Sequence, residues 1–427
     1  MKRALIITYY WPPAGGPGVQ RWLKFVKYFK EFGVEPIVYV PENPNYPLLD
    51  KNLSSEIPSE IEIIKHPINE PYRFAKIISK KKTRQMSSGI IAKKEISALE
   101  KLLLYVRGNF FIPDARVGWV KPSVKFLSEY MVENPVEVVI TTGPPHSLHL
   151  IGRQLQQKLK VRWIADFRDP WTTIHYHKSL RLGKAAAWKH KALEASVIKA
   201  ADVITVTSPT TKKEFELIAK TPIVVITNGY DISEKIEIEM DTHFSISHIG
   251  SLLSERNPEV LWKVLAEICK ENSVFKDDLR LKFAGAVSAE VKQSLEDFQL
   301  LEKCEFLGYV SHSEALKLQH QSQVLLLVEI NSPETRAIIP GKLFEYLAAQ
   351  RPILALGPKE SDMEGIINET NAGKCFSYYD DSALRTEILE YYAAFKSGAL
   401  KIVSEGIEKY SRRELTKQMA ALILQSK

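Results

Sequence analysis

The stretch Pro340–Leu356, PGKLFEYLAAQRPILAL, predicts a helix followed directly by a short buried strand. Pro340 starts the helix, and the apolar run Ile353–Leu356 has the length and composition of a strand. The amides at such a helix start can bind a diphosphate together with Lys342, and Glu345 one turn further can accept both hydroxyls of a ribose. Alternatively, Glu345 only complements the dipole of its helix.

Further short apolar runs alternate with helical patterns along the whole chain. The predicted strands of the first half are Ala4–Thr8, Pro36–Val40, Ile61–Lys65, Val136–Thr141, Arg162–Ala165, Val203–Thr207 and Ile223–Ile226; those of the second are Phe244–Ile249, Leu279–Ala284, Cys304–Leu307, Val324–Val328, Ile353–Leu356 and Lys374–Phe376. This alternation is typical of parallel sheets with helices on both faces. Each half is therefore predicted to form its own doubly wound, Rossmann-like α/β sheet, since 427 residues exceed one ordinary core.

The domain boundary is indicated by the turn-rich residues Thr227–Asp231 and the polar stretch after them. We expect an N-terminal domain over residues 1–231, a linker over 232–243 and a C-terminal domain over 244–403. Residues 404–427 are predicted to form helices that pack back on the N-terminal domain.

The composition is that of a folded globular protein, with 45% hydrophobic and 26% charged residues. The apolar start Ala4–Ile7 is too short for a signal peptide, and no apolar run approaches the roughly 20 residues of a membrane span, so we expect a cytoplasmic protein. Cys269, Cys304 and Cys375 are too widely spaced for a zinc motif. No metal site is predicted.

Positive charge is concentrated in residues 73–111. Ten lysines and arginines lie between Arg73 and Arg107, against Glu95 and Glu100, and apolar residues are interleaved with them. This pattern is expected of a segment that lies on an anionic membrane surface, which would make the protein peripheral on the inner face of the cell membrane. A solvated helix pair explains it equally well. Nucleic acid is not expected as a partner, because no recognition module accompanies the charge.

A glycine-rich loop, residues 12–18, follows the first predicted strand and opens a helix. Its Gly15 and Gly16 allow backbone amides to approach an anion at the helix start. The loop also suggests a nicotinamide-dependent oxidoreductase, although Arg21 stands where a dinucleotide fingerprint has its third glycine.

Three further loops carry chemistry. His146 follows one strand and could bind an acceptor, act in proton transfer or cap the next helix, and Asp166 and Asp169 follow another, where open α/β sheets bind ligands. Either acid could orient acceptor hydroxyls or serve as a base, or pair internally with Arg168. After a third strand, Asn257 and Pro258 are predicted to cap and begin a helix, so that Arg256 can meet a phosphate.

The order and spacing of these motifs resemble the family 4 glycosyltransferases of the GT-B fold, and among them bacterial enzymes of surface-polysaccharide synthesis that are similar to acetamidosugar transferases. The segments that carry the resemblance are Tyr10–Pro13 with Gly15 and Gly16, Asp166–Trp171, Asn228–Asp231, Gly250–Arg256, Phe306–Val310 and Lys342–Pro352.

The resemblance implies two Rossmann-like domains that face each other across a cleft. The C-terminal domain would bind a UDP- or GDP-sugar, with the base near Tyr309 and Val310, the ribose on Glu345 and the diphosphate between Arg256 and Lys342. The N-terminal domain would hold a lipid-linked or polysaccharide acceptor, with its glycine loop near the phosphates. The implied reaction transfers a hexose or acetamidohexose with retention, and it needs no metal and no cofactor beyond the nucleotide sugar as co-substrate.

Two positions depart from the family pattern. Ser251 stands where an arginine usually follows the glycine, and Ala337 replaces the earlier of two glutamates eight positions apart; Glu334 or Arg336 could compensate. These departures leave a second hypothesis open, namely a catalytically silent glycosyltransferase-like subunit of a glycan assembly complex.

Overall fold

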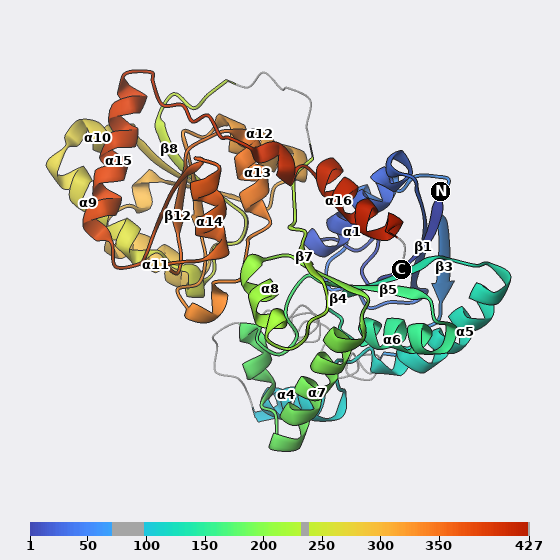
Figure 1. Cartoon of the computed structure of the whole chain (residues 1–427). Coiled ribbons are helices and arrows are strands. Elements are labelled where there is room, and N and C mark those ends of the chain that lie inside the picture. Colours follow the sequence, from blue (N-terminus) through green and yellow to red (C-terminus); the bar gives the residue numbers. More distant parts are fainter. Residues whose placement is uncertain (71–97, 232–238, 426–427) are drawn as a thin grey trace. The chain divides into compact units, whose positions relative to one another are not determined.

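The computed structural model describes residues 1–70, 98–231 and 239–425. It divides into two compact units, one made of residues 1–228 with 412–427 and the other of residues 229–411 (Figure 1). Most of the basic segment, residues 73–97, lies outside the described residues.

The N-terminal unit is built on a seven-stranded parallel sheet in the order β3-β2-β1-β4-β5-β6-β7. The strands are β1 Lys2–Ile7, β2 Val34–Pro41, β3 Glu62–His66, β4 Val138–Gly143, β5 Arg162–Phe167, β6 Val203–Val206 and β7 Ile223–Val225. The helices are α1 Pro17–Tyr28, α4 Ala98–Phe110, α5 Val120–Glu133, α6 Ser147–Leu159, α7 Lys184–Ala200, α8 Pro209–Glu216 and α16 Arg412–Leu424.

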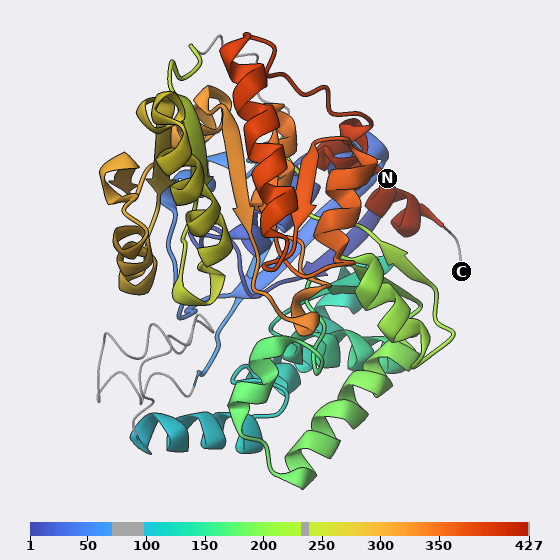
Figure 2. The same cartoon turned by 90° about the vertical axis from the view of Figure 1, so that its left-hand side faces the viewer.

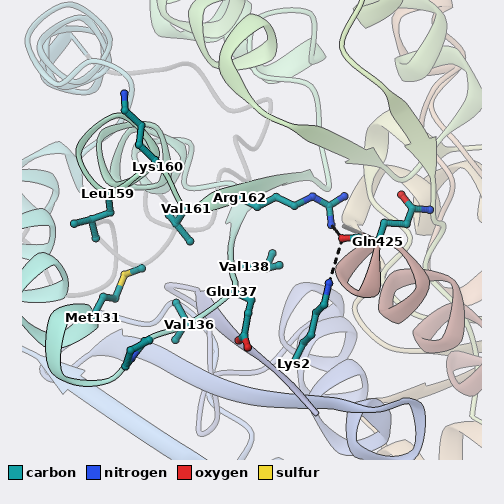
Figure 3. Close-up of a pocket in the computed structure, with 11 residues that line it drawn as sticks. Lys2, Met131, Val136, Glu137, Val138, Leu159, Lys160, Val161, Arg162 and Gln425 are labelled. Carbon is teal, nitrogen blue, oxygen red and sulfur yellow. Dashed lines mark hydrogen bonds between the residues drawn. The ribbon is translucent and has the colours of Figure 1, made fainter. Parts of the chain in front are cut away.

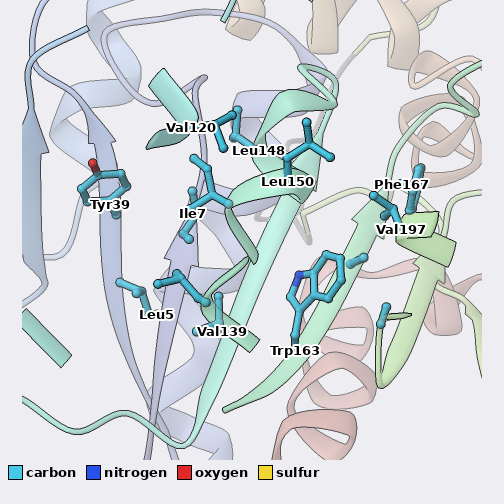
Figure 4. Close-up of a cluster of buried hydrophobic side chains, with 14 of the residues drawn as sticks. Leu5, Ile7, Tyr39, Val120, Val139, Leu148, Leu150, Trp163, Phe167 and Val197 are labelled. Atoms are coloured by element: carbon cyan, nitrogen blue, oxygen red, sulfur yellow. The ribbon is translucent and has the colours of Figure 1, made fainter. Parts of the chain in front are cut away.

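Alternating side chains of this sheet enter two separate cores, because successive residues of a strand point to opposite faces. Leu5 and Ile7 of β1 pack with residues of α5, α6 and α7 (Figure 4). Ala4 and Ile6 pack with α1 and α16 on the other face. Helix α16 is thus an integral layer of the N-terminal unit, although it is the last helix of the chain.

The C-terminal unit has a six-stranded parallel sheet in the order β10-β9-β8-β11-β12-β13. Its strands are β8 Phe244–Ile249, β9 Leu279–Ala284, β10 Cys304–Gly308, β11 Val324–Val328, β12 Ile353–Leu356 and β13 Gly373–Phe376. Its helices are α9 Glu259–Glu271, α10 Ser273–Asp278, α11 Ala289–Asp297, α12 His312–Gln321, α13 Lys342–Ala349, α14 Asp362–Glu369 and α15 Asp381–Lys396. Figure 2 views the face that α9 and α15 cover, while α13 and α14 pack on the opposite face.

The predicted fold class, an α/β protein with two Rossmann-like sheets, is confirmed, and every predicted strand overlaps an observed one. The unit limits differ from the predicted domain limits at both crossings. The amide of Tyr230 donates to Tyr410 O at 3.1 Å and its hydroxyl to Ile407 O at 3.3 Å, so both segments belong to the C-terminal unit. Residues 404–411 therefore belong to the C-terminal unit, whereas the prediction grouped them with the helices that pack on the N-terminal domain.

The start of α9 also differs from the prediction. The helix begins at Glu259, with Pro258 in the cap position, rather than at Pro258 with Asn257 as the cap. The side-chain oxygen of Asn257 accepts instead from the indole of Trp262 at 2.8 Å, and this contact draws it away from the helix amides.

Candidate functional site

The sequence motifs converge at the carboxyl edges of the two sheets, since all strands of a parallel sheet end at the same edge. In the C-terminal unit the loops after β8 and β11 and the start of α13 carry them. In the N-terminal unit the loops after β1, β4 and β5 do so. Each edge is described separately below.

Lys342 is the central cation of the C-terminal edge. Its Nζ atom lies 3.1 Å from Nε2 of His248, a buried residue of β8. Gly250 makes room for it, since a side-chain Cβ on this glycine would lie 2.6 Å from the same Nζ. Burial, followed by the charge of Arg256, lowers the pKa of Lys342 to about 8, although Glu329 and Glu345 act in the opposite direction.

His248 holds Lys342 as a neutral imidazole. Burial, followed by the charge of Lys342, keeps the pKa of His248 well below its ordinary value. Its Nδ1 lies 3.0 Å from Leu326 O and its Nε2 lies 3.4 Å from Ser251 O, and both carbonyls can only accept. Because the Lys342 ammonium, which can only donate, is the nearer neighbour of Nε2, the tautomer that satisfies these contacts has its proton on Nδ1 and its lone pair on Nε2. A strand residue thereby orients the ammonium group that the sequence singled out.

Arg256 is fixed by an acid that sequence reasoning missed. Its Nε and Nη2 donate to one carboxylate oxygen of Glu329, at 3.2 and 2.9 Å. Glu329 is buried and also accepts from the amide of Ile330 at 2.7 Å. An acid directly after the apolar strand Val324–Val328 is the same signal that drew attention to Asp166, and it could have been found in the sequence.

The other predicted nucleotide-sugar residues of this unit are Glu345, Tyr309 and Val310. Glu345 is half-buried, and its Oε2 accepts from Nε2 of Gln319 on α12 at 3.0 Å. Tyr309 is 93% exposed just after β10, and Val310 is half-buried against the core beside α13. Arg256 and Glu345 therefore lie close enough to Lys342 at this edge to change its pKa, while Tyr309 extends into solvent.

Of the two departures from the family pattern, the sequence offered substitutes only for the glutamate that Ala337 replaces, namely Glu334 and Arg336. Glu334 is exposed, and Nη1 of Arg336 lies 3.8 Å from Glu360, so Arg336 is directed to a surface acid. Glu329 is instead the buried carboxylate that accompanies the cations. It was not among the predicted site residues.

Asp166, a predicted catalytic residue, is structural by its geometry. It is fully buried, and Oδ1 accepts from Nη2 of Arg21 at 2.9 Å and from Thr205 at 2.8 Å. Oδ2 accepts from the Trp22 indole at 2.9 Å and from Thr142 at 2.8 Å. Burial raises the pKa of this carboxyl, but Arg21 and the hydroxyl hydrogen bonds outweigh it and hold the pKa below its ordinary value. Both oxygens accept from internal donors, so the geometry points to a structural role for Asp166, and its catalytic role stays a prediction.

Arg168, which was predicted as a possible ion-pair partner of Asp166 or Asp169, contacts the end of β4 and the loop after it and also interacts electrostatically with both acids. Its Nε donates to Gly143 O at 3.3 Å, and its Nη2 donates to Pro144 O. Its guanidinium also fills the space beside Gly18 in the first turn of α1, where a Cβ would lie 1.5 Å from Nη1. Burial lowers the pKa of Arg168, and Asp169 opposes that shift. Arg168 thus connects the glycine loop, the β4 loop and the β5 loop.

Three predicted site residues lie in loops that Arg168 connects. Gly15 and Gly16 belong to the glycine loop, and Asp169 belongs to the loop after β5. Gly15 donates its amide to Leu48 O at 3.1 Å, and Gly16 has a φ of 106°, a conformation that favours glycine. Asp169 is half-buried and keeps its electrostatic interaction with Arg168.

His146 is buried at the end of β4, and its ring stacks on Trp171 with centroids 5.2 Å apart. Neither ring nitrogen has a hydrogen-bond partner in the part of the chain that the structure describes. Burial, followed by the charges of His149 and Arg168, keeps its pKa well below the ordinary value, so the ring is neutral. It occupies the cap position of α6 without capping it through its side chain, which removes the capping explanation.

A pocket at the opposite, amino edge of the N-terminal sheet serves the fold rather than the site (Figure 3). Lys2 donates to Leu424 O at 2.8 Å, and Arg162 donates to Gln425 O at 2.8 Å. These cations satisfy carbonyls at the end of α16. In residues 1–70, 98–231 and 239–425, no cluster of three or more His, Cys, Asp or Glu side chains could hold a metal ion.

Two family models match consecutive parts of the chain: one described as Glycosyltransferase Family 4 over residues 90–234, and one described as Glycosyl transferases group 1 over residues 231–393. No curated protein matches the sequence. Similar solved structures include the sucrose-phosphate synthase of Thermosynechococcus elongatus, with 13% identity, a TM-score of 0.61 and coverage of 99% of this chain and 98% of that one. HepE of Anabaena, solved in complex with UDP and glucose, has 12% identity, a TM-score of 0.60 and 99% coverage of both chains. The lipopolysaccharide outer core galactosyltransferase WaaB has 14% identity, a TM-score of 0.59 and 99% coverage of both chains.

Proposed function

Because the chain belongs to the family 4 glycosyltransferases of the GT-B fold, we propose that it transfers a hexose or acetamidohexose from a UDP- or GDP-sugar to a lipid-linked or polysaccharide acceptor in cell-surface glycan synthesis. The nucleotide sugar is the only co-substrate in this proposal, and neither a metal nor a further cofactor takes part. We also propose that the transfer retains the configuration of the anomeric carbon, because this is what the resemblance to the family implies.

The observation that carries the proposal is the pair of cations at the carboxyl edge of the C-terminal sheet. Lys342 and Arg256 interact electrostatically there, and each is oriented by a buried partner, His248 and Glu329 respectively. Glu345 lies one turn into α13, within reach of the same cluster. A diphosphate with an attached ribose presents the complementary groups.

The chemistry follows from the bond to be broken. Cleavage between the anomeric carbon and the phosphate leaves negative charge on the departing diphosphate, and preorganised cations stabilise such charge with little reorganisation. Lys342 supplies its full charge only below its pKa of about 8, and Glu329 keeps Arg256 in one orientation while offsetting part of its charge. HepE of Anabaena, a protein of similar fold, was solved with UDP and glucose, which is consistent with a nucleotide-sugar donor in this proposal.

The acceptor is assigned to the N-terminal unit. Neither nitrogen of the buried, neutral ring of His146 has a hydrogen-bond partner among the described residues, so one of them is proposed to contact an acceptor hydroxyl. Asp169 lies in the neighbouring loop as a second candidate contact. The basic segment 73–111 supports an acceptor held at an anionic membrane surface, on the cytoplasmic side of the cell membrane.

The test is donor binding and turnover by Lys342→Met and Glu345→Gln. We expect Lys342→Met to weaken UDP binding in calorimetry by between about 10- and 100-fold, as for loss of a charge-assisted hydrogen bond. Glu345→Gln should weaken UDP binding but leave binding of inorganic diphosphate unchanged. Lys263→Met, on the surface of α9 in the same unit, is the matched control and should bind as the wild type does. Unchanged donor turnover in both site variants would refute the assignment.

A catalytically silent subunit is the second candidate, and Ser251 and Ala337 favour it. Arg256 forms an ion pair with Glu329, which offsets part of its positive charge. The site therefore offers a diphosphate less net positive charge than it would if both Arg256 and Lys342 were unpaired. This candidate predicts weak UDP binding without release of sugar from any nucleotide sugar of a panel. Measurable sugar release that Lys342→Met abolishes would exclude it.

A further inference from the structure

Helix α7 of the N-terminal unit exposes a tryptophan that no part of the proposed active site uses. Trp188 is 73% exposed, whereas each of the other six tryptophans of the chain is at most 2% exposed. A large aromatic side chain in contact with water loses the free energy that burial would provide, so such exposure requires an explanation.

The surroundings of Trp188 are basic. Lys184, Trp188 and Lys191 are spaced by four and three residues, which places them on one face of α7. Arg181 and Lys189 are also exposed beside them, and residues 181–191 contain no acidic side chain. We call Arg181, Lys184, Trp188, Lys189 and Lys191 the α7 outer face.

This face is fixed in orientation by the buried side of the helix. His190, about 200° around the helix from Trp188, lies with its Nε2 3.1 Å from Gly108 O at the end of α4. The amide of Gly183 donates to the Asn109 side chain at 2.8 Å, which ties the start of α7 to the same place. Trp188 is therefore held away from the core and cannot turn inward without breaking these contacts.

Helix α4, beside the start of α7 in Figure 1, adds exposed apolar side chains. Leu102, Tyr105 and Phe110 are 56%, 45% and 72% exposed. No helix among the described residues is long and apolar enough to cross a membrane. Scattered aromatic groups among lysines instead suit a surface that rests in the boundary between lipid headgroups and acyl chains.

We infer that the α7 outer face docks the protein on a membrane that contains anionic lipids, with Trp188 entering the headgroup boundary and the lysines meeting lipid phosphates. This inference rests on the proposed function, because it places the N-terminal unit where a lipid-linked acceptor is presented. It adds a named contact outside residues 73–97. Anionic lipid is favoured over an acidic protein partner because the charge surrounds an aromatic group that prefers the lipid interface.

The experiment uses the fluorescence of the full-length protein with vesicles of phosphatidylcholine alone or with phosphatidylglycerol. Trp188 is the tryptophan open to solvent, so it alone should shift to the blue and be quenched by lipids with brominated acyl chains. We expect this change only with phosphatidylglycerol present and weaker at high salt. In Trp188→Phe the brominated lipid should have no effect, and each lysine of the face changed to Gln should weaken vesicle binding about fivefold.

Control variants keep the outcome unambiguous. Tyr379→Ala removes an 82% exposed aromatic side chain of the C-terminal unit and should bind vesicles normally. Sedimentation with vesicles without quenching of Trp188, or no sedimentation with phosphatidylglycerol, would overturn the inference. Sugar release measured without vesicles on the same samples separates the two proposals: its absence would contradict the enzymatic function while leaving a positive quenching result intact.

Discussion

Replacement of Asp166 by Asn decides whether this acid is catalytic or structural. Asp166 accepts from two groups that can only donate, namely Nη2 of Arg21 and the Trp22 indole, each on a different carboxylate oxygen. An Asn side chain offers one oxygen, so its NH₂ group must face one of these donors. The change also leaves Arg21, which is 4% exposed, without its counter-charge.

The expected cost follows from these losses. Breaking a buried ion pair by removing one partner typically costs about 3–5 kcal/mol. For a unit of this size each kcal/mol lowers the melting temperature by about 2–4 °C, so Asp166→Asn should melt roughly 6–20 °C below the wild type. Loss of activity should follow loss of the folded unit rather than precede it.

The assay is scanning calorimetry of the full-length protein, with sugar transfer measured well below the melting temperature. Asp169→Asn is the matched control, because this half-buried acid should give less than a third of the shift. The double variant Arg21→Gln with Asp166→Asn should recover part of the loss, since it leaves no unpaired charge. If Asp166→Asn melted within about 2 °C of the wild type and yet lost transfer at low temperature, the structural reading would be refuted.

Three further outcomes are expected. Lys342 has a pKa of about 8, so UDP affinity should fall as the pH rises through that value, by no more than the loss that Lys342→Met causes, and calorimetric titrations of Lys342→Met should show no such limb. His248→Phe removes the acceptor that holds Lys342, so it should raise the donor KM about tenfold in steady-state kinetics and move the alkaline limb to lower pH, whereas an unmoved limb would contradict the positioning role. Gly285 has a φ of 120°, and a Cβ at this position would lie 2.7 Å from the backbone of Gly250. Chemical denaturation should therefore show that Gly285→Ala lowers the free energy of unfolding by about 2–4 kcal/mol. The control Gly365→Ala, in open space within α14, should leave the free energy of unfolding unchanged or raise it slightly.

The pH dependence of folding gives a second check on Asp166. Its pKa is held below the ordinary value, so its stabilising contribution is present above about pH 4, the unfolded value, and is lost as the pH falls through the folded pKa. Acid unfolding monitored by circular dichroism should therefore be less steep in Asp166→Asn than in the wild type.

The sequence by itself determined the architecture. Short apolar runs separated by helical patterns are typical of parallel sheets covered on both faces, and the thirteen predicted strands overlap the thirteen strands of the described chain. It also placed Arg256 and His146 in loops after strands and Lys342 at a helix start, because strand ends and helix starts are local features that residue types and spacing reveal.

Tertiary structure alone decided which charges meet. Asp166 pairs with Arg21, 145 positions away, rather than with the nearby Arg168, and Lys342 is oriented by His248, 94 positions away. Partners so distant are brought together by the order of strands in a sheet, in which β1 lies beside β4 and β8 beside β11. That order is fixed by the packing of whole layers of the core, so a short motif read along the chain contains no information about it.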